Sequence, residues 1–206
     1  MTMKTTLDTL YYTEGSSYLP PVLPEYIRDF SDELPVETFL PYGFSKICDA
    51  ALKPEYRFIS NPEVNPIQYN VVKGKEEKYN SYGEYIYLLV IDGKIIKIGG
   101  TYVGMKGRHG SYNCGTRKAR EKGTCSLTNF EITEYQYAAI RAGKKVEWYV
   151  FDVPLAETTI NLPWGDEIKY DAKTYMKYES SLCHKYAQLR GAVPPCNKQD
   201  TGSGGS

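Results

Sequence analysis

The chain has 206 residues, a formal net charge of zero and 41% hydrophobic residues, values typical of one folded domain with extensions. Zero net charge argues against nonspecific binding to nucleic acids through overall charge. No apolar run approaches the length that spans a membrane, and the N-terminal residues lack the apolar core of a secretory leader. We therefore expect a cytoplasmic protein that does not contact a membrane.

The five cysteines form no CxxC pair, and their odd number without a leader favours reduced thiols. A zinc site is the alternative for Cys114, Cys125, Cys183, His184 and Cys196. Their spacing matches no recurrent pattern of zinc ligands, so the sequence disfavours zinc.

Residues 1–80 are predicted to form an N-terminal extension or subdomain with helical character. Short helices are expected over 26–34 and 45–52, the second ended by Pro54. The polar run 73–80 is expected to connect this extension to the domain that follows. Nothing in the extension has the pattern of a catalytic site, so packing and support of a dimer are its expected roles.

A β-hairpin is predicted to follow the extension. Two runs rich in β-branched and aromatic residues, 85–91 and 95–98, flank the dipeptide Asp92-Gly93. Asp-Gly tolerates the positive φ angles of a type I′ turn, which makes it a strong hairpin signal.

Polar side chains are expected to converge at one edge of this hairpin. Tyr87 lies in the first strand, Lys97 at the end of the second, and Arg108 just beyond it. Between 94 and 123 there are eight lysines or arginines, and Glu121 is the only acid. Such a basic stripe indicates a surface that holds a polyanion, with a solvated lysine-rich loop as the alternative.

Three further elements are predicted before the last helix. A helix within 102–126 is expected to be weak, because each interior glycine costs about 1 kcal/mol relative to alanine. A helix is expected over 132–142, and 145–153 alternates like a strand that joins the hairpin as a third strand. Residues 154–170 form a long insertion, and one interpretation is an arm that grips DNA or a partner subunit.

The last predicted helix, 173–190, carries a carboxylate on its apolar stripe. Glu179 lies three residues after Met176 and three before Leu182, on the same face. A buried carboxylate is costly unless a cation meets it, so an ion pair with an arginine and a metal site are the two alternatives. The glycine- and serine-rich residues 201–206 are expected to be a flexible tail.

Five motifs in this order resemble the GIY-YIG nuclease superfamily, and within it a small type II restriction endonuclease with lysine in the second motif. The motifs are Tyr85-Ile86-Tyr87, Lys97-Ile98-Gly99, Arg108, Glu179 and Asn197. Tyr85 departs from the glycine of the first motif, and Lys97 departs from the tyrosine of the second. The resemblance implies an α+β fold in which residues 81–200 form the nuclease domain, with a small three-stranded antiparallel sheet flanked by helices.

The resemblance also implies catalytic roles for four residues. Glu179 would be the sole protein ligand of one Mg²⁺, for which Mn²⁺ is a substitute. Arg108 would neutralise charge on the phosphate, because its planar guanidinium matches phosphate geometry. Tyr87 would be the general base, with Lys97 favouring its phenolate, and neutral Lys97 as the base is the alternative.

Other residues have supporting roles in this interpretation. His109 and Tyr112 would hold the water or the phosphate, and Asn197 would brace the C-terminal segment or contact the backbone. The residues expected to contact DNA are Lys106, Arg117, Lys118, Arg120 and Lys122.

The expected function is that of a site-specific double-strand DNA endonuclease, a type II restriction enzyme. A symmetric DNA site requires a two-fold homodimer, and the host is expected to contain a cognate DNA methyltransferase. Groove contacts by residues 1–80 are the alternative to a packing role. The alternatives for the whole chain are a phage or homing-type GIY-YIG nuclease of looser specificity and a catalytically silent DNA-binding module.

Overall fold

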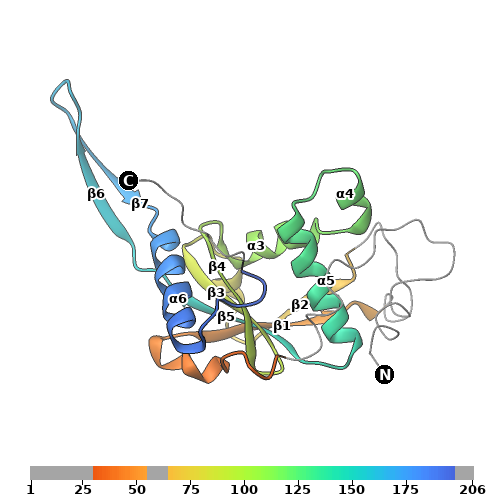
Figure 1. Ribbon diagram of the computed structural model, residues 1–206. Coiled ribbons are helices and arrows are strands. Elements are labelled where there is room, and N and C mark those ends of the chain that lie inside the picture. Colours follow the sequence, from red (N-terminus) through yellow and green to blue (C-terminus); the bar gives the residue numbers. More distant parts are fainter. Residues whose placement is uncertain (1–29, 55–64, 198–206) are drawn as a thin grey trace.

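The computed structural model describes residues 30–54 and 65–197 (Figure 1). The expected helix over 26–34 begins outside these residues, and its described part, 30–34, is a turn and not a helix. The tail 201–206 lies wholly outside the described residues. The described elements begin with η1 (Val36–Thr38), η2 (Leu40–Tyr42), β1 (Ser45–Leu52), β2 (Ile67–Val71) and α2 (Glu76–Asn80). They continue with β3 (Tyr85–Ile91), β4 (Lys94–Thr101), α3 (Gly104–Asn113), α4 (Arg117–Glu121), α5 (Leu127–Arg141), β5 (Val146–Asp152), β6 (Ala156–Asn161), β7 (Glu167–Ala172) and α6 (Tyr175–Arg190).

The main sheet is antiparallel and has five strands in the order β2-β1-β5-β3-β4, so the expectation of three strands was wrong. The helix expected over 45–52 was also wrong, because this segment is strand β1. Its backbone pairs with β2 on one side and β5 on the other, which gives it more partners than a short isolated helix would have. Residues before 81 therefore supply two strands of the same sheet as the hairpin.

The predicted β3–β4 hairpin is confirmed. Asp92 and Gly93 at the turn have φ angles of 48° and 78°, the positive values that the dipeptide was expected to adopt. Every side chain of β3 is buried, as befits a central strand between β5 and β4. The prediction that 145–153 joins the hairpin is confirmed too, since β5 pairs with β3 along its whole length.

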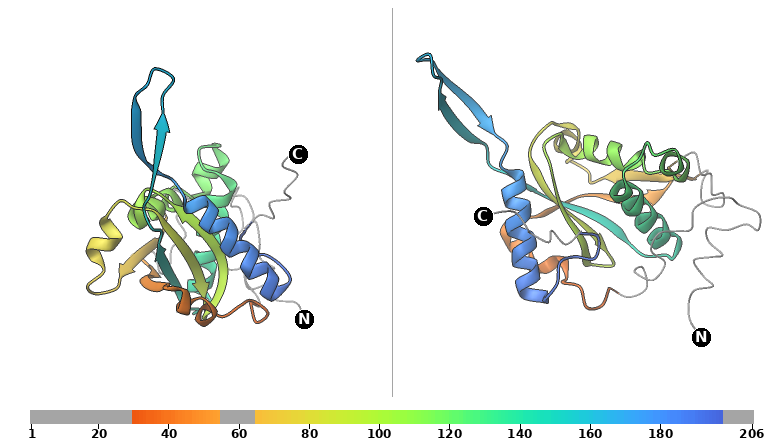
Figure 2. Two further views of the ribbon diagram at one scale, coloured as in Figure 1. Left: turned by 90° about the vertical axis from the view of Figure 1, so that its left-hand side faces the viewer. Right: turned by 45° about the horizontal axis from the view of Figure 1, so that its top comes forward.

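Helices cover both faces of the sheet. Helices α3 and α5 pack on one face, against a core that contains Tyr87, Leu89 and Trp148. Helix α6 packs on the other face, where Tyr186 joins a second core cluster beside Ile98. Figure 2 shows α6 on one side of the sheet and α5 on the other. Strand β4 is the edge strand on which residues from both layers meet.

The helices after the hairpin differ in part from expectation. Helix α3 forms despite its three glycines because Met105, His109 and Tyr112 are buried against the sheet. Helix α5 begins at Leu127, five residues before the predicted start, because the Ser126 side chain accepts a hydrogen bond from the Asn129 amide.

The insertion expected at 154–170 is a two-stranded hairpin formed by β6 and β7. It projects from the body of the molecule near the start of α6 (Figure 1). No helix in 30–54 or 65–197 is long and apolar enough to cross a membrane.

Candidate active site

Tyr87 lies at the centre of the polar cluster, on the face of the sheet covered by α3. Its ring is buried, and its hydroxyl reaches over Gly99, its direct partner on β4. A Cβ atom at residue 99 would collide with the Tyr87 hydroxyl, so glycine is required there for space, not for backbone conformation. The strand pairing therefore fixes the position of the phenol oxygen at the edge of the sheet.

Two side chains of helix α3 contact the hydroxyl oxygen of Tyr87. Arg108 and Tyr112 are one helical turn apart and so share a face of the helix. The Arg108 Nε donates to the Tyr87 oxygen over 3.0 Å, and the Tyr112 hydroxyl lies 2.8 Å from the same oxygen. The guanidinium also stacks over the Tyr112 ring, 4.5 Å from its centroid.

Electrostatics keep both partners of Tyr87 protonated. Burial, together with Tyr87, raises the pKa of Tyr112 well above its ordinary value. Burial opposes the charge of Arg108, but the neighbouring Tyr87 and Tyr112 outweigh it and raise the pKa of the guanidinium. Two donors that keep their protons thus face the phenol oxygen of Tyr87.

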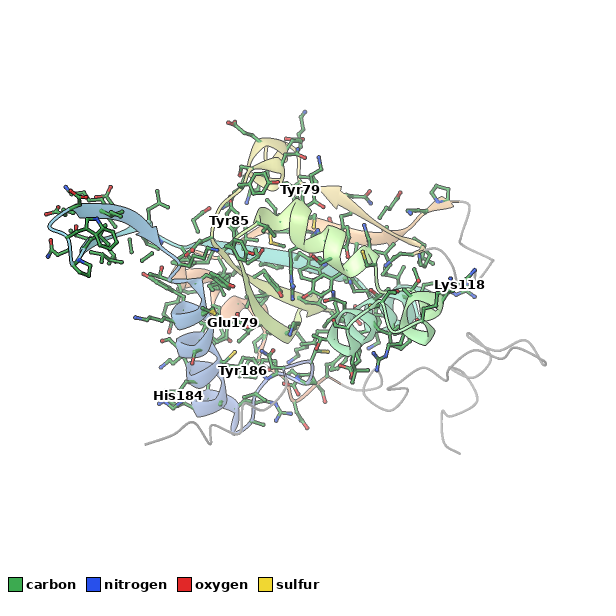
Figure 3. The ribbon with its side chains drawn as sticks, turned by 90° about the horizontal axis from the view of Figure 1, so that it is seen from above. Tyr79, Tyr85, Lys118, Glu179, His184 and Tyr186 are labelled. Carbon is green, nitrogen blue, oxygen red and sulfur yellow. The ribbon has the colours of Figure 1, made fainter. Side chains whose placement is uncertain are left out.

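Glu179 approaches the same edge from the opposite face of the sheet. It lies on α6 beside Gly100, where a Cβ atom would come within 2.8 Å of its carboxylate oxygen (Figure 3). Burial raises the pKa of Glu179, while Lys97, a hydrogen bond from the Gly100 amide and Arg108 oppose that rise. Because residues 99 and 100 have no side chains, only a thin strip of backbone separates Tyr87 from Glu179.

The expected apolar stripe around Glu179 is only partly buried. Tyr186 is buried and Leu182 is half-buried against the sheet, whereas Met176 and Leu189 are 60% and 49% exposed. No ion pair of Glu179 with an arginine is present in the described part of the chain, and its cationic neighbours act at longer range.

Lys97 is buried and tied to the C-terminal segment. Its ammonium donates to the carbonyl of Cys196 over 3.2 Å. Lys97 lies two residues before Gly99, so it is a diagonal neighbour of Tyr87 on the same face of the sheet. Asn197 pairs with the backbone of Ile98 through both its amide oxygen and its amide nitrogen, each over 2.8 Å. The segment thereby covers the free edge of β4 and fixes the position of Lys97.

His109 lies in the core and not at this cluster. Its ring is buried, stacks on Tyr69 with centroids 3.7 Å apart, and meets the edge of Trp148. The hydroxyl of Tyr79 lies 3.0 Å from its Nδ1. Burial and the adjacent Arg108 lower the pKa of His109 to about 3. The neutral, enclosed imidazole packs α3 against the sheet.

The residues expected to contact DNA are spread over α3 and α4. Lys106 and Lys122 are exposed, Lys118 is half-exposed, and Arg120 donates to the Cys125 carbonyl over 3.2 Å. The side chain of Arg117 lies outside what the structure describes. Figure 3 shows Lys118 on the side of the molecule away from Glu179. A ligand that reached both places would span much of one face.

Several positioning residues were not recognised in the sequence. The Glu84 carboxylate accepts hydrogen bonds from the amides of Thr174 and Tyr175 at the start of α6. Asn65 and Thr133 both donate to the carbonyl of Tyr112 and hold the end of α3. Sequence periodicity gives no signal for such contacts, because each joins segments far apart in the chain.

The side chains at the edge of β4 offer few ligands for a metal ion. No cluster of three or more histidine, cysteine, aspartate or glutamate side chains occurs among the described residues. Glu179 would therefore be a single protein ligand, next to the Gly100 amide that hydrogen-bonds its carboxylate. That donor set fits Mg²⁺, which keeps most of its waters, and does not fit a structural zinc site.

Two nucleases are among the solved structures that resemble this chain. A structure of the restriction endonuclease HPY188I in complex with product DNA is 24% identical, covers 84% of this chain and 91% of its own, and has a TM-score of 0.54. The EndoII mutant of bacteriophage T4 is 19% identical, with coverage of 79% and 97% and a TM-score of 0.49. No protein-family model matches the sequence, and no curated protein matches it. The chain thus shares the fold of the HPY188I structure.

Proposed function

We propose that the protein is a GIY-YIG-type endonuclease that hydrolyses phosphodiester bonds of double-stranded DNA. The observation that carries this proposal is the meeting of three groups at the edge of β4. The Tyr87 oxygen, held by Tyr112 and Arg108, lies across the Gly99–Gly100 strip from the carboxylate of Glu179. A base, a guanidinium and a lone carboxylate are the parts that metal-assisted phosphodiester hydrolysis requires.

The proton acceptor for the attacking water is Tyr87 in this proposal. An ordinary phenol ionises near pH 10 and is a weak base at neutral pH. Hydrogen bonds from Arg108 and Tyr112 favour the phenolate, and the ammonium of Lys97 on the same sheet face acts in the same direction. Lys97 donates to the Cys196 carbonyl, a bond that the charged amine makes well, which supports its role as a cation.

Arg108 and Glu179 would manage charge on the phosphate. The Arg108 guanidinium hydrogen-bonds Tyr87 through Nε and also hydrogen-bonds Tyr112, which leaves its remaining N–H groups for phosphoryl oxygens. Glu179 would hold one Mg²⁺ or Mn²⁺, which when bound would stabilise the departing oxygen.

Site specificity is part of the proposal. The fold shared with HPY188I, a restriction endonuclease described with product DNA, supports DNA as the substrate and a type II restriction enzyme as the class. An enzyme of this class would cut a symmetric site as a dimer, and its host would need a cognate DNA methyltransferase.

The test is cleavage of plasmid DNA with and without Mg²⁺, followed by sequencing of the ends. Glu179→Gln should abolish cleavage and leave DNA affinity within about tenfold, because phosphate and base contacts elsewhere hold the duplex. Glu157→Gln, a change of the same kind on the exposed arm, is the control and should cut normally. Cutting by Glu179→Gln at the wild-type rate would remove the proposed metal site. No cleavage by the wild type on any DNA would favour a silent DNA-binding module, and scattered ends would favour a nuclease of looser specificity.

A further inference from the structure

The arm formed by β6 and β7 has one apolar and one polar face. Ile160 stands directly opposite Ile168 in the register, so their side chains share a face, and they are 44% and 47% exposed. The neighbouring pairs Thr159–Lys169 and Asn161–Glu167 point to the other face. An amphipathic hairpin of this kind normally packs its apolar face against another layer.

No such layer is present within the described part of the chain. Strands β6 and β7 pack extensively only with each other, and both views of Figure 2 show them standing clear of the body. Leu155 at the base and Trp164 at the tip are 80% and 72% exposed. A two-stranded hairpin is marginally stable alone in water, so its uncovered apolar side chains indicate a partner.

The charges of the arm oppose DNA as that partner. Glu157, Asp166 and Glu167 are exposed on it, and Lys169 is the only basic residue between 155 and 172. A surface with this excess of acids repels phosphate groups. The partner should instead offer an apolar surface with a positive charge at its border.

The same chain contains a groove with these properties. It lies between α6, η2 and the sheet, on the face away from Tyr87, and has a volume of about 430 Å³. Its lining is mostly aromatic and aliphatic, with Tyr42, Phe44, Ile86, Phe151, Tyr178 and Leu182 beside Ser181. Lys185 also lines the groove and supplies the positive charge.

We propose that the apolar face of the arm occupies this groove on a second copy of the chain, and that two copies exchange arms reciprocally. Apolar side chains would then cover apolar side chains, and the acids near the tip would approach Lys185. Six residues per strand give the arm a length of about 20 Å. Reciprocal exchange is a closed, two-fold contact that does not extend into fibres. This interface does not depend on the proposed nuclease activity.

The first test is the mass of the full chain in solution, measured by light scattering without DNA over a range of concentrations. The wild type should be a dimer. Ile160→Ser combined with Ile168→Ser, and separately Tyr178→Glu in the groove, should each raise the dimer dissociation constant about tenfold or more. Glu157→Gln combined with Lys169→Gln, on the polar face of the arm, is the matched control and should stay dimeric. Thermal unfolding should show that the body remains folded in every variant.

The second test mixes the two defective proteins. The arm variant keeps an intact groove and the groove variant keeps an intact arm, so the mixture should form heterodimers through one arm-in-groove contact. Recovery of dimers on mixing supports the proposal. A monomeric wild type overturns the proposal. A groove variant that stays dimeric by itself also overturns it, because the arms would then pair with each other and not with the groove. Two monomeric variants that form no dimer on mixing overturn it as well. Arm variants that stay dimeric but lose DNA affinity would show that the arm contacts DNA instead.

Discussion

The hydroxyl of Tyr112 lies 2.8 Å from the hydroxyl of Tyr87, and the two residues are 25 positions apart on a helix and a strand. Burial and the nearness of Tyr87 raise the pKa of Tyr112 well above the ordinary range, so Tyr112 stays protonated. Of the two phenols, Tyr87 is also the acceptor of the Arg108 Nε hydrogen bond. The two phenols therefore differ in their surroundings: Tyr112 stays protonated, and Tyr87 receives the hydrogen bond of the guanidinium.

Tyr112→Phe removes one of the two donors to the proposed base. A hydrogen bond to a charged group contributes about 1.5–3 kcal/mol, so cleavage at neutral pH should fall about 10- to 100-fold. The loss should shrink as pH rises and the Tyr87 phenol ionises without help. Tyr69→Phe removes a hydroxyl from the same aromatic core without contacting Tyr87, and should keep the wild-type pH profile. A uniform loss across pH would mean that Tyr112 acts only through packing.

Lys97→Met and Tyr87→Phe distinguish the two candidates for the general base. Both should lower the cleavage rate about 100-fold or more near neutral pH. Lys97→Met retains the phenol, so its activity should recover in part at alkaline pH, whereas Tyr87→Phe should stay low throughout. The measurement is single-turnover cleavage from pH 6 to about 10. The opposite pattern would make neutral Lys97 the base and Tyr87 its orienting partner.

Gly99→Ala and Gly100→Ala test the thin strip between Tyr87 and Glu179. At residue 99 the new methyl group would displace the Tyr87 hydroxyl, and at residue 100 it would meet Tyr175 and Glu179. Each variant should lose most cleavage activity while the protein stays folded. Gly110→Ala in α3 is the control, because a Cβ atom there meets nothing within 4 Å, and alanine favours a helix. Wild-type rates in the residue 99 variant would contradict the assigned position of Tyr87.

The buried imidazole of His109 should make the folded protein less stable in mild acid. Burial and Arg108 lower its pKa in the folded state to about 3, whereas an unfolded histidine titrates near 6.5. The neutral imidazole is therefore favoured by folding, and this contribution is complete above about pH 6.5 and is lost as pH falls towards 3. Urea unfolding should show a decrease of about 1.4 kcal/mol per pH unit in this window. His109→Phe should flatten this slope, and His184→Gln, on the exposed side of α6, should keep it.

Salt dependence tests the exposed basic residues of α3 and α4. Binding of a DNA duplex should weaken steeply with salt, because each neutralised phosphate releases a counterion. Lys106→Ala and Lys122→Ala should each reduce the slope of log K against log salt by about 1 if the residue contacts a phosphate. Lys73→Ala, an exposed lysine before α2, is the matched control. Equal slopes in all four proteins would mean that these lysines face solvent in the complex.

Local sequence determined the hairpin, the third strand β5 and the last helix. Asp92-Gly93 specifies its turn through backbone angles alone, and alternation in β5 and periodicity in α6 depend on near neighbours only. The order of the motifs also predicted that Tyr87, Arg108 and Glu179 belong to one site. Their proximity could be anticipated because two of them lie in one hairpin-to-helix unit.

Tertiary structure alone decided the rest. Segment 45–52 is short and lacks a clear period, so its strand conformation depends on partners on both sides, β2 and β5, that no local pattern reveals. The sequence placed His109 beside Arg108 as a candidate to hold the phosphate. Consecutive residues of a helix point in different directions, so the His109 ring lies in the core against Tyr69 and Trp148. The side chain of Lys97 is directed by the carbonyl of Cys196, 99 residues later. Contacts between distant segments depend on how the layers pack, and the sequence of each segment by itself carries no record of its partner.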